Sequence, residues 1–220
     1  MYKACIFDLD GTLTDTLESL TCSVNTMLGE MGLASITADE CRAFVGNGAR
    51  KLVEKSIRAT GDPEATRLEE AVEIYGRVFQ KLCTYHVKPY EGIVELLELL
   101  KKKGVHMAVL SNKPDAQTKD VVATFFAKDT FEYVQGQKED VPRKPDPTAV
   151  FMILDKLQVK REECLYIGDS EVDMKTGNAA GVDTVGVTWG FRSKDVLLEE
   201  NATYIADKAE EIIAIVEGVK

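Results

Sequence analysis

Apolar residues recur along this chain in two spacings that predict where strands and helices lie. Short apolar runs predict buried strands, and the first of these runs ends at Phe7. Steps of three and four residues predict amphipathic helices, as in the series Leu17, Leu20 and Val24. Gly32 ends this first helix, because glycine favours the left-handed conformation common at helix C-termini.

The predicted elements change in kind along the chain. Helices are expected one after another at 17–31, 37–44, 49–60 and 64–83. Thr37 and Glu40 have the spacing of a capping box, which starts the second of these helices. From Tyr90 onward, strands and helices alternate. The strands are expected at 105–110, 131–134, 163–167, 184–187 and 203–205, and the helices at 91–103, 115–127, 145–157, 171–180 and 208–216.

Strands that alternate with helices are typical of an α/β fold with a parallel, doubly wound sheet. The helical block interrupts this alternation directly after the first strand. We therefore expect a Rossmann-like α/β core formed by residues 1–15 and 85–220. Residues 16–84 are expected to be inserted into this core as an all-helical cap domain.

Charge, hydrophobicity and cysteine content limit the partners of the protein and indicate its cellular compartment. The chain has 220 residues with 27 basic and 37 acidic side chains, and its net charge of −10 argues against nucleic acid or an anionic membrane. No apolar run approaches the ~20 residues that cross a bilayer, and the sequence enters a strand at once, so we expect no signal peptide. Five cysteines without a C-x-x-C pair indicate reduced thiols and a cytoplasmic protein.

Short polar residues follow three of the predicted strands. They are Asp8 and Asp10 after the first strand, Ser111-Asn112 after the strand at 105–110, and Asp169-Ser170 after the strand at 163–167. In a parallel sheet the carboxyl ends of the strands meet at one crevice, so we expect these side chains to share a site. Asp8 and Asp10 point to the same side of a strand, and neighbouring carboxylates favour a hard cation such as Mg²⁺ between them.

Each of these residues also has a structural explanation when it is taken singly. Asp10-Gly11 is a common turn dipeptide, and Ser111-Asn112 suits a helix cap. Lys144 fits a solvated loop, and Asp169 and Asp173 suit the positive end of a helix dipole. The functional interpretation rests on the combination of all these residues in one chain.

In this combination the chain resembles the haloacid dehalogenase-like superfamily, whose four motifs are all present and in order. The motifs are Asp8-Leu9-Asp10-Gly11-Thr12, Ser111, Lys144, and Gly168-Asp169-Ser170-Glu171-Val172-Asp173. The resemblance covers nearly the whole chain, and the helical block matches the cap that this superfamily inserts after its first motif. Four ordered motifs are a specific signal, whereas any one of them alone is weak.

The resemblance implies a role for each motif residue. Asp8 would be the nucleophile that forms an aspartyl-phosphate, and Asp10 would protonate the leaving oxygen and then activate water. Mg²⁺ would bind Asp8, the backbone carbonyl of Asp10, and Asp169, with Asp173 supporting the metal directly or through water. The phosphoryl oxygens would be held by Ser111, Lys144 and the amides of Leu9 and Asn112.

Asp10 indicates which reaction of the superfamily is favoured. Relatives that cleave carbon–halogen bonds or phosphonates lack an acid at this position, so Asp10 favours hydrolysis of a phosphate ester. Phosphosugar mutases usually carry a β-branched apolar residue where this chain has Thr12. A mutase of the β-phosphoglucomutase type is therefore a less favoured alternative.

The cap is expected to select the substrate. Residues 45–50 resemble the cap loop of phosphoglycolate phosphatases, and Thr188-Trp189-Gly190 also recurs in that group. In this glycine-bounded loop, Asn47 and Arg50 would contact the substrate, with Arg50 pairing with a carboxylate. The alternative is a simple turn between helices with Arg50 in solvent.

These observations together predict a magnesium-dependent phosphatase that acts on a small phosphorylated metabolite, with 2-phosphoglycolate as the first candidate. Pyrophosphate, a nucleotide and a sugar phosphate remain open as substrates. A regulatory or binding protein on a retained fold is the alternative from another functional class. The expected assembly is a monomer or a homodimer.

Overall fold

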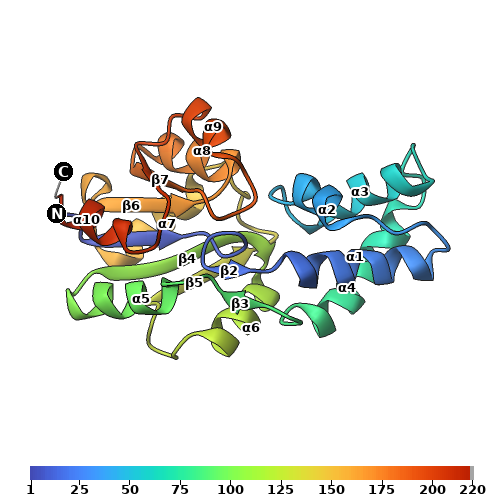
Figure 1. Ribbon diagram of the computed structural model, residues 1–220, viewed down its shortest axis with the longest axis horizontal. Coiled ribbons are helices and arrows are strands. Elements are labelled where there is room, and N and C mark those ends of the chain that lie inside the picture. Colours follow the sequence, from blue (N-terminus) through green and yellow to red (C-terminus); the bar gives the residue numbers. More distant parts are fainter. Residues whose placement is uncertain (219–220) are drawn as a thin grey trace.

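The main sheet has six strands, and all of its strand pairs are parallel (Figure 1). The computed structural model describes residues 1–218. The strands are β1 (Ala4–Phe7), β4 (His106–Pro114), β5 (Tyr133–Gln137), β6 (Cys164–Gly168), β7 (Asp183–Val187) and β8 (Tyr204–Ala206). Their order is β5-β4-β1-β6-β7-β8, so β1 lies between β4 and β6. The carboxyl ends of these three strands therefore meet at one edge of the sheet.

Helices cover both faces of the sheet, because side chains alternate along each strand. In β1, Cys5 and Phe7 belong to one hydrophobic cluster, and Ala4 and Ile6 belong to another. The first cluster is covered by α5 (Ile93–Lys102), α6 (Asp115–Phe125) and α10 (Glu211–Glu217), and the second by α7 (Thr148–Leu157) and α8 (Glu171–Ala180). A short helix, α9 (Lys194–Glu199), packs against β7. The predicted doubly wound α/β fold is confirmed.

Four consecutive helices form a separate layer at the edge of the sheet where β1 ends (Figure 1). They are α1 (Leu17–Glu30), α2 (Ala38–Phe44), α3 (Ala49–Thr60) and α4 (Leu68–Leu82). These helices share their own hydrophobic cluster, which includes Leu20, Val24, Leu52, Tyr75 and Phe79. The chain enters and leaves this layer through a two-stranded antiparallel pair, β2 (Thr14–Asp15) and β3 (Lys88–Pro89).

Several element boundaries differ from the sequence prediction for identifiable reasons. The helix expected from 64 begins only at Leu68, because the Asp62 carboxylate accepts the backbone N–H groups of Thr66 and Arg67 and holds a turn there. The strand expected at 105–110 continues to Pro114, with a register shift after residue 110. The spacing of apolar residues did not predict α9, β2 and β3, because these elements are too short to show a period.

The predicted start of the helix after Thr37 is confirmed. Thr37 and Glu40 form the reciprocal hydrogen bonds of a capping box at the start of α2. Across residues 1–218, none of the helices combines the length and the apolar character that crossing a membrane requires.

The same substitution at two helical glycines should change stability in opposite directions. A Cβ at Gly177 in α8 would collide with the Thr184 methyl group and lie 3.1 Å from Tyr166 Cβ, so Gly177→Ala should lower the free energy of unfolding by about 1–3 kcal/mol. Gly76 in α4 is exposed, and a Cβ added there would meet no other atom within 4 Å. Gly76→Ala should therefore raise the free energy of unfolding by about 0.5–1 kcal/mol. Urea unfolding midpoints measure both effects, and a stabilising Gly177→Ala would contradict the packing of α8 on the sheet.

Candidate active site

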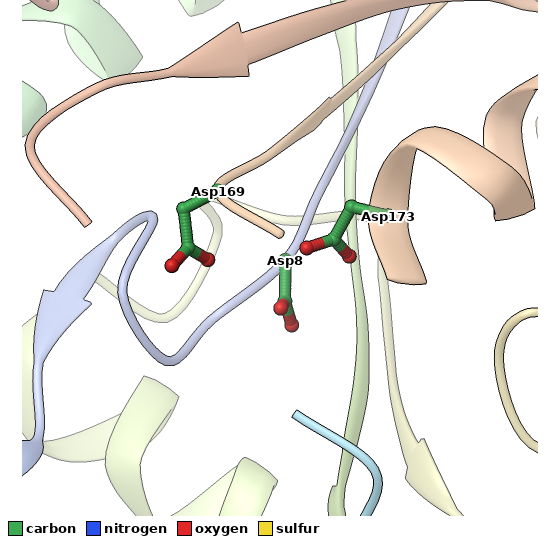
Figure 2. Close-up of side chains that lie close together, drawn as sticks. All are labelled: Asp8, Asp169 and Asp173. Carbon is green, nitrogen blue, oxygen red and sulfur yellow. The ribbon is translucent and has the colours of Figure 1, made fainter. Parts of the chain in front are cut away.

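Three carboxylates converge at the carboxyl ends of β1 and β6 (Figure 2). Asp8 follows β1, Asp169 follows β6, and Asp173 lies in the first turn of α8. One oxygen of each side chain lies within 4.8 Å of the other two, and all three residues are buried. The parallel topology thus brings together Asp8 and Asp169, which are 161 positions apart in the sequence, as predicted from the ends of the strands.

Lys144 joins two of these carboxylates. Its Nζ lies 3.0 Å from Asp8 Oδ1 and 2.8 Å from Asp173 Oδ1, and its side chain is only 2% exposed. Burial by itself lowers the pKa of Lys144, but Asp173 and Asp8 outweigh burial and raise that pKa well above its ordinary value. The buried lysine therefore carries a positive charge and fixes the position of Asp8.

The carboxylates repel one another in spite of this lysine. Burial, together with the charges of Asp173 and Asp10, raises the pKa of Asp8 to about 7, against the opposing effects of Lys144 and the Leu9 N–H. Burial and the charges of Asp173 and Asp8 likewise raise the pKa of Asp169 well above its usual range. The site thus holds more negative charge than its own lysines neutralise.

This excess of negative charge fits a divalent cation. When the carboxyl groups of Asp8, Asp10, Asp169 and Asp173 are all ionised, the ammonium groups of Lys113 and Lys144 balance only two of the four negative charges. Carboxylate oxygens are the donors that hard cations prefer. The cluster of Asp8, Asp169 and Asp173 could therefore hold a metal ion.

Asp169 is held in place by close backbone packing and two hydrogen bonds. Thr12 Oγ1 donates to Asp169 Oδ1 at 3.1 Å, and the Phe191 N–H donates to Asp169 Oδ2 at 2.7 Å. A Cβ at Gly11 or at Gly190 would overlap the Asp169 side chain, and Gly11 has a φ of +83°. Both positions thus require glycine, and the first motif and the loop after β7 enclose Asp169 together.

A second buried ion pair lies beside the first. Lys113 Nζ lies 2.8 Å from Asp10 Oδ1, and the lysine side chain is 1% exposed. The same Nζ lies 4.8 Å from the centre of the Phe79 ring of α4. Sequence reasoning missed Lys113, although the lysine directly follows Ser111-Asn112 at the end of an apolar run.

Asn112 connects three parts of the site. Its Nδ2 donates to the carbonyl of Gly46 at 3.0 Å and to that of Lys144 at 3.1 Å. Its Oδ1 accepts the Lys144 N–H at 3.0 Å. The Asn112 side chain therefore positions the segment that carries Lys144 and contacts the loop between α2 and α3.

Ser111 and Leu9 also lie at the site. Ser111 is buried and lines the same cavity as Asp8. The Leu9 N–H donates to Asp8 Oδ1 at 2.7 Å, so this amide holds the carboxylate in place. One Asp8 oxygen is thereby bonded to Leu9 and Lys144, which leaves the other for different partners.

Arg192 fastens the loop before α3 to the core. Its guanidinium donates to the carbonyl of Arg42 at 2.8 Å and to that of Val45 at 2.7 Å. Its Nε donates to Glu171 at the start of α8 at 2.8 Å. Together with Asn112, Arg192 therefore joins the helical layer to the α/β core directly over the carboxylates.

The structure brings neither Asn47 nor Arg50 into the cavity, although the sequence predicted both as substrate contacts. The Arg50 guanidinium donates to Glu69 on α4, with 47% of its side chain exposed. The Asn47 carbonyl accepts a hydrogen bond from Arg143 at 3.1 Å. Neither residue is among those lining the cavity, and the Glu69 carboxylate already satisfies the charge of Arg50.

A cavity of about 40 Å³ lies between the core and the helical layer. Its core wall includes Asp8, Asp10, Ser111, Asn112, Lys113 and Asp169, and its wall from the helical layer includes Leu20, Val45, Leu52, Tyr75 and Phe79. The charged groups thus lie on one wall and apolar groups on the other. Such an arrangement suits a small ligand that has one anionic end.

Comparison with known proteins agrees with this geometry. Residues 5–187 match the model of the haloacid dehalogenase-like hydrolase family. The chain is 32% identical over 214 residues to a phosphoglycolate phosphatase of Pseudomonas savastanoi pv. phaseolicola, covering 96% of this chain and 78% of that protein. It is 30% identical over 220 residues to the phosphoglycolate phosphatase of Haemophilus influenzae, covering 97% and 98%.

A solved structure resembles this one along its whole length. It is a protein of Lactobacillus delbrueckii subsp. bulgaricus that is provisionally named a phosphoglycolate phosphatase. The two share 33% of their residues with a TM-score of 0.90, and the match covers 98% of each chain. The protein therefore belongs to the haloacid dehalogenase-like hydrolase family.

Proposed function

We propose that this protein is a magnesium-dependent phosphatase that hydrolyses a small phosphomonoester, with 2-phosphoglycolate as the leading substrate. The proposal rests chiefly on the position of Asp8, which Lys144 and the Leu9 N–H hold at the base of the cavity, beside the Asp10–Lys113 pair. The names of the relatives from Pseudomonas and Haemophilus support 2-phosphoglycolate.

Asp8 acts as the nucleophile in this proposal. Its free oxygen attacks phosphorus and forms an aspartyl-phosphate while the bond from phosphorus to the leaving oxygen breaks. Asp10 donates a proton to that leaving oxygen, and the alcohol is released. Asp10 then accepts a proton from a water that attacks phosphorus, which breaks the bond to Asp8 and releases phosphate. The Lys113 ammonium positions Asp10 for both steps.

Mg²⁺ would be held by Asp8, Asp169 and the backbone carbonyl of Asp10, with Asp173 as a supporting group. When bound, it supplies the positive charge that lets an anionic nucleophile approach an anionic phosphate. Asp173 is itself fixed by Lys144 and by the Ser170 hydroxyl, which donates to it at 2.5 Å. In this proposal the phosphoryl oxygens would accept hydrogen bonds from Ser111, which lines the cavity, and from Lys144, whose ammonium lies 3.0 Å from Asp8 Oδ1.

Residues 16–84 would serve as the cap in this scheme. The hydrogen bonds of Arg192 and Asn112 to cap carbonyls describe a closed arrangement over the carboxylates. Closure excludes water while the aspartyl-phosphate forms, and opening admits substrate and releases product. The antiparallel pair of β2 and β3 is the segment about which the cap would move.

The alternative functions receive less support from the site. A nucleotide would need a wider opening of the cap than a small phosphomonoester, because the space enclosed between the core and the helical layer is small. Pyrophosphate and small sugar phosphates remain alternatives within the phosphatase class. A phosphosugar mutase is less favoured, because such enzymes usually carry a β-branched apolar residue at position 12. Here that position is Thr12, whose hydroxyl donates to Asp169. We also propose that the protein acts in the cytoplasm, which its five free cysteines support.

Replacing the nucleophile should abolish hydrolysis. Asp8→Asn keeps the size of the side chain and removes its charge, so kcat/KM for 2-phosphoglycolate should fall by roughly 10³-fold or more. The measurement is phosphate release with unchanged circular dichroism. Asp155→Asn, at an exposed position of α7, is the matched control and should keep full activity. Hydrolysis retained by folded Asp8→Asn would refute the mechanism.

Stability without metal should depend on pH through Asp8. The folded state raises the pKa of Asp8 to about 7, whereas the unfolded chain keeps a value near 4. Between these pH values the folded state binds more protons, so the stability of the metal-free protein falls as the pH rises from about 4 to about 7. Mg²⁺ relieves the repulsion among ionised carboxylates, so it should raise the Tm more at pH 8 than at pH 5.

Thermal unfolding with and without MgCl₂, at matched ionic strength, measures this difference. Asp169→Asn removes one of the carboxylates and should lose most of the rise at pH 8. An equal rise at both pH values, or an undiminished rise in Asp169→Asn, would contradict the proposed metal site.

Removing the Arg192 contacts should weaken closure of the cap. Arg192→Ala loses two hydrogen bonds to cap carbonyls and one to Glu171, so kcat/KM should fall about tenfold. Arg161→Ala, on the surface beside Phe151, is the matched control and should keep the activity of the unaltered enzyme. An Arg192→Ala enzyme of full activity would show that these contacts do not contribute to catalysis.

A further inference from the structure

Tyr75, which lines the catalytic cavity, carries a buried hydroxyl without a hydrogen-bond partner in residues 1–218. Tyr75 lies on α4, is 2% exposed and lines the cavity together with Asp8 and Asp10. Among the residues that the structure describes, none forms a hydrogen bond with its hydroxyl. Buried hydroxyls are nearly always hydrogen-bonded, because an unmet buried donor is costly. Because Tyr75 itself lines the cavity, a bound ligand is the partner that would satisfy this hydroxyl.

Lys113 brings a second donor to the same place. The Phe79 ring stacks on the Tyr75 ring, with 5.1 Å between centroids and 20° between planes, and Lys113 Nζ lies 4.8 Å from the centre of the Phe79 ring. A lysine ammonium has three N–H donors, and within residues 1–218 Asp10 is its one hydrogen-bonding acceptor. Tyr75 and Lys113 thus reach the cavity from opposite walls, with the Phe79 ring in contact with both.

The other side chains on the cap wall of the cavity limit which ligand groups can bind next to Tyr75 and Lys113. Leu20, Val45 and Leu52 line this wall and offer no polar side-chain atom to a ligand. An ammonium and a phenol both donate hydrogen bonds, so the ligand group between them must accept. A carboxylate fits this requirement, because its oxygens accept hydrogen bonds without donating any and its negative charge pairs with Lys113. The cavity of about 40 Å³ leaves room for only a few atoms between this group and the reacting phosphorus.

We propose that Tyr75 and Lys113 form a subsite that binds the carboxylate of the leaving group. The inference rests on the proposed phosphatase function, because it assigns the part of the substrate that departs from phosphorus. The sequence had predicted that Arg50 binds the substrate carboxylate, but Arg50 is paired with Glu69. The proposal assigns this role instead to two residues that line the cavity.

The test compares two substrates that differ only in this group. In 2-hydroxyethyl phosphate a hydroxymethyl group replaces the carboxylate of 2-phosphoglycolate, and the ester is otherwise the same. The measured quantity is the ratio of kcat/KM for 2-phosphoglycolate to kcat/KM for 2-hydroxyethyl phosphate. Tyr75→Phe should lower this ratio by roughly tenfold or more, the effect of losing one hydrogen bond to a charged group.

A second readout separates recognition from a structural role. Because Tyr75→Phe removes a hydroxyl that has no partner in residues 1–218, the Tm of the free enzyme should stay the same or rise. Lys113→Met should lower the same kcat/KM ratio through loss of charge. Tyr85→Phe, at an exposed position outside this cavity, is the matched control and should change neither the ratio nor the Tm.

The possible outcomes test the carboxylate subsite separately from the proposed phosphatase function. If the unaltered enzyme releases phosphate from neither ester, the proposed phosphatase function fails and the subsite fails with it. If it hydrolyses both esters and Tyr75→Phe leaves their ratio unchanged, the phosphatase stands and the carboxylate subsite is refuted. A lowered ratio with an unchanged Tm supports the subsite.

Discussion

The remainder of the structure depends on the burial of charge at the carboxyl edge of the sheet. Lys144 lies within 3.0 Å of both Asp8 and Asp173, and an ammonium at this depth is tolerated only because such partners surround it. A second pair, Asp10 with Lys113, repeats the arrangement next to it. The two pairs leave an excess of carboxylate. This excess adds to the effect of burial in raising the pKa of Asp8, and it makes the site suitable for a divalent cation.

The same constraint relates the α/β core to the helical layer. The carboxylates would be solvated if the sheet edge were open, but the helical layer covers them, and Phe79 lies over Lys113. Arg192 and Asn112 donate to carbonyls of the helical layer, so hydrogen bonds between side chains and backbone help to hold this layer over the site. Contacts of this kind can be broken and remade, which is what the proposed movement of the cap requires.

Much of the fold and the centre of the site could be predicted from the sequence, because local patterns carry them. Apolar runs locate strands such as β1 and β6, and a parallel topology brings Asp8 and Asp169 together. Contacts between distant segments leave no such pattern. Arg50 was predicted to contact substrate because nothing local reveals Glu69, 19 residues further on, as its partner. Apolar spacing likewise placed Tyr75 on the buried side of a helix without showing that this residue lines the catalytic cavity.

The central claim is that Asp8 is phosphorylated during turnover. Acid quenching during steady-state hydrolysis of 2-phosphoglycolate, followed by borohydride reduction and peptide mass mapping, detects an acyl phosphate directly. If Asp8 is the nucleophile, its carboxyl is converted to an alcohol only when substrate is present, in the peptide that contains Asp8 and nowhere else. Phosphate release without modification of Asp8, or modification of a different carboxylate, would contradict it.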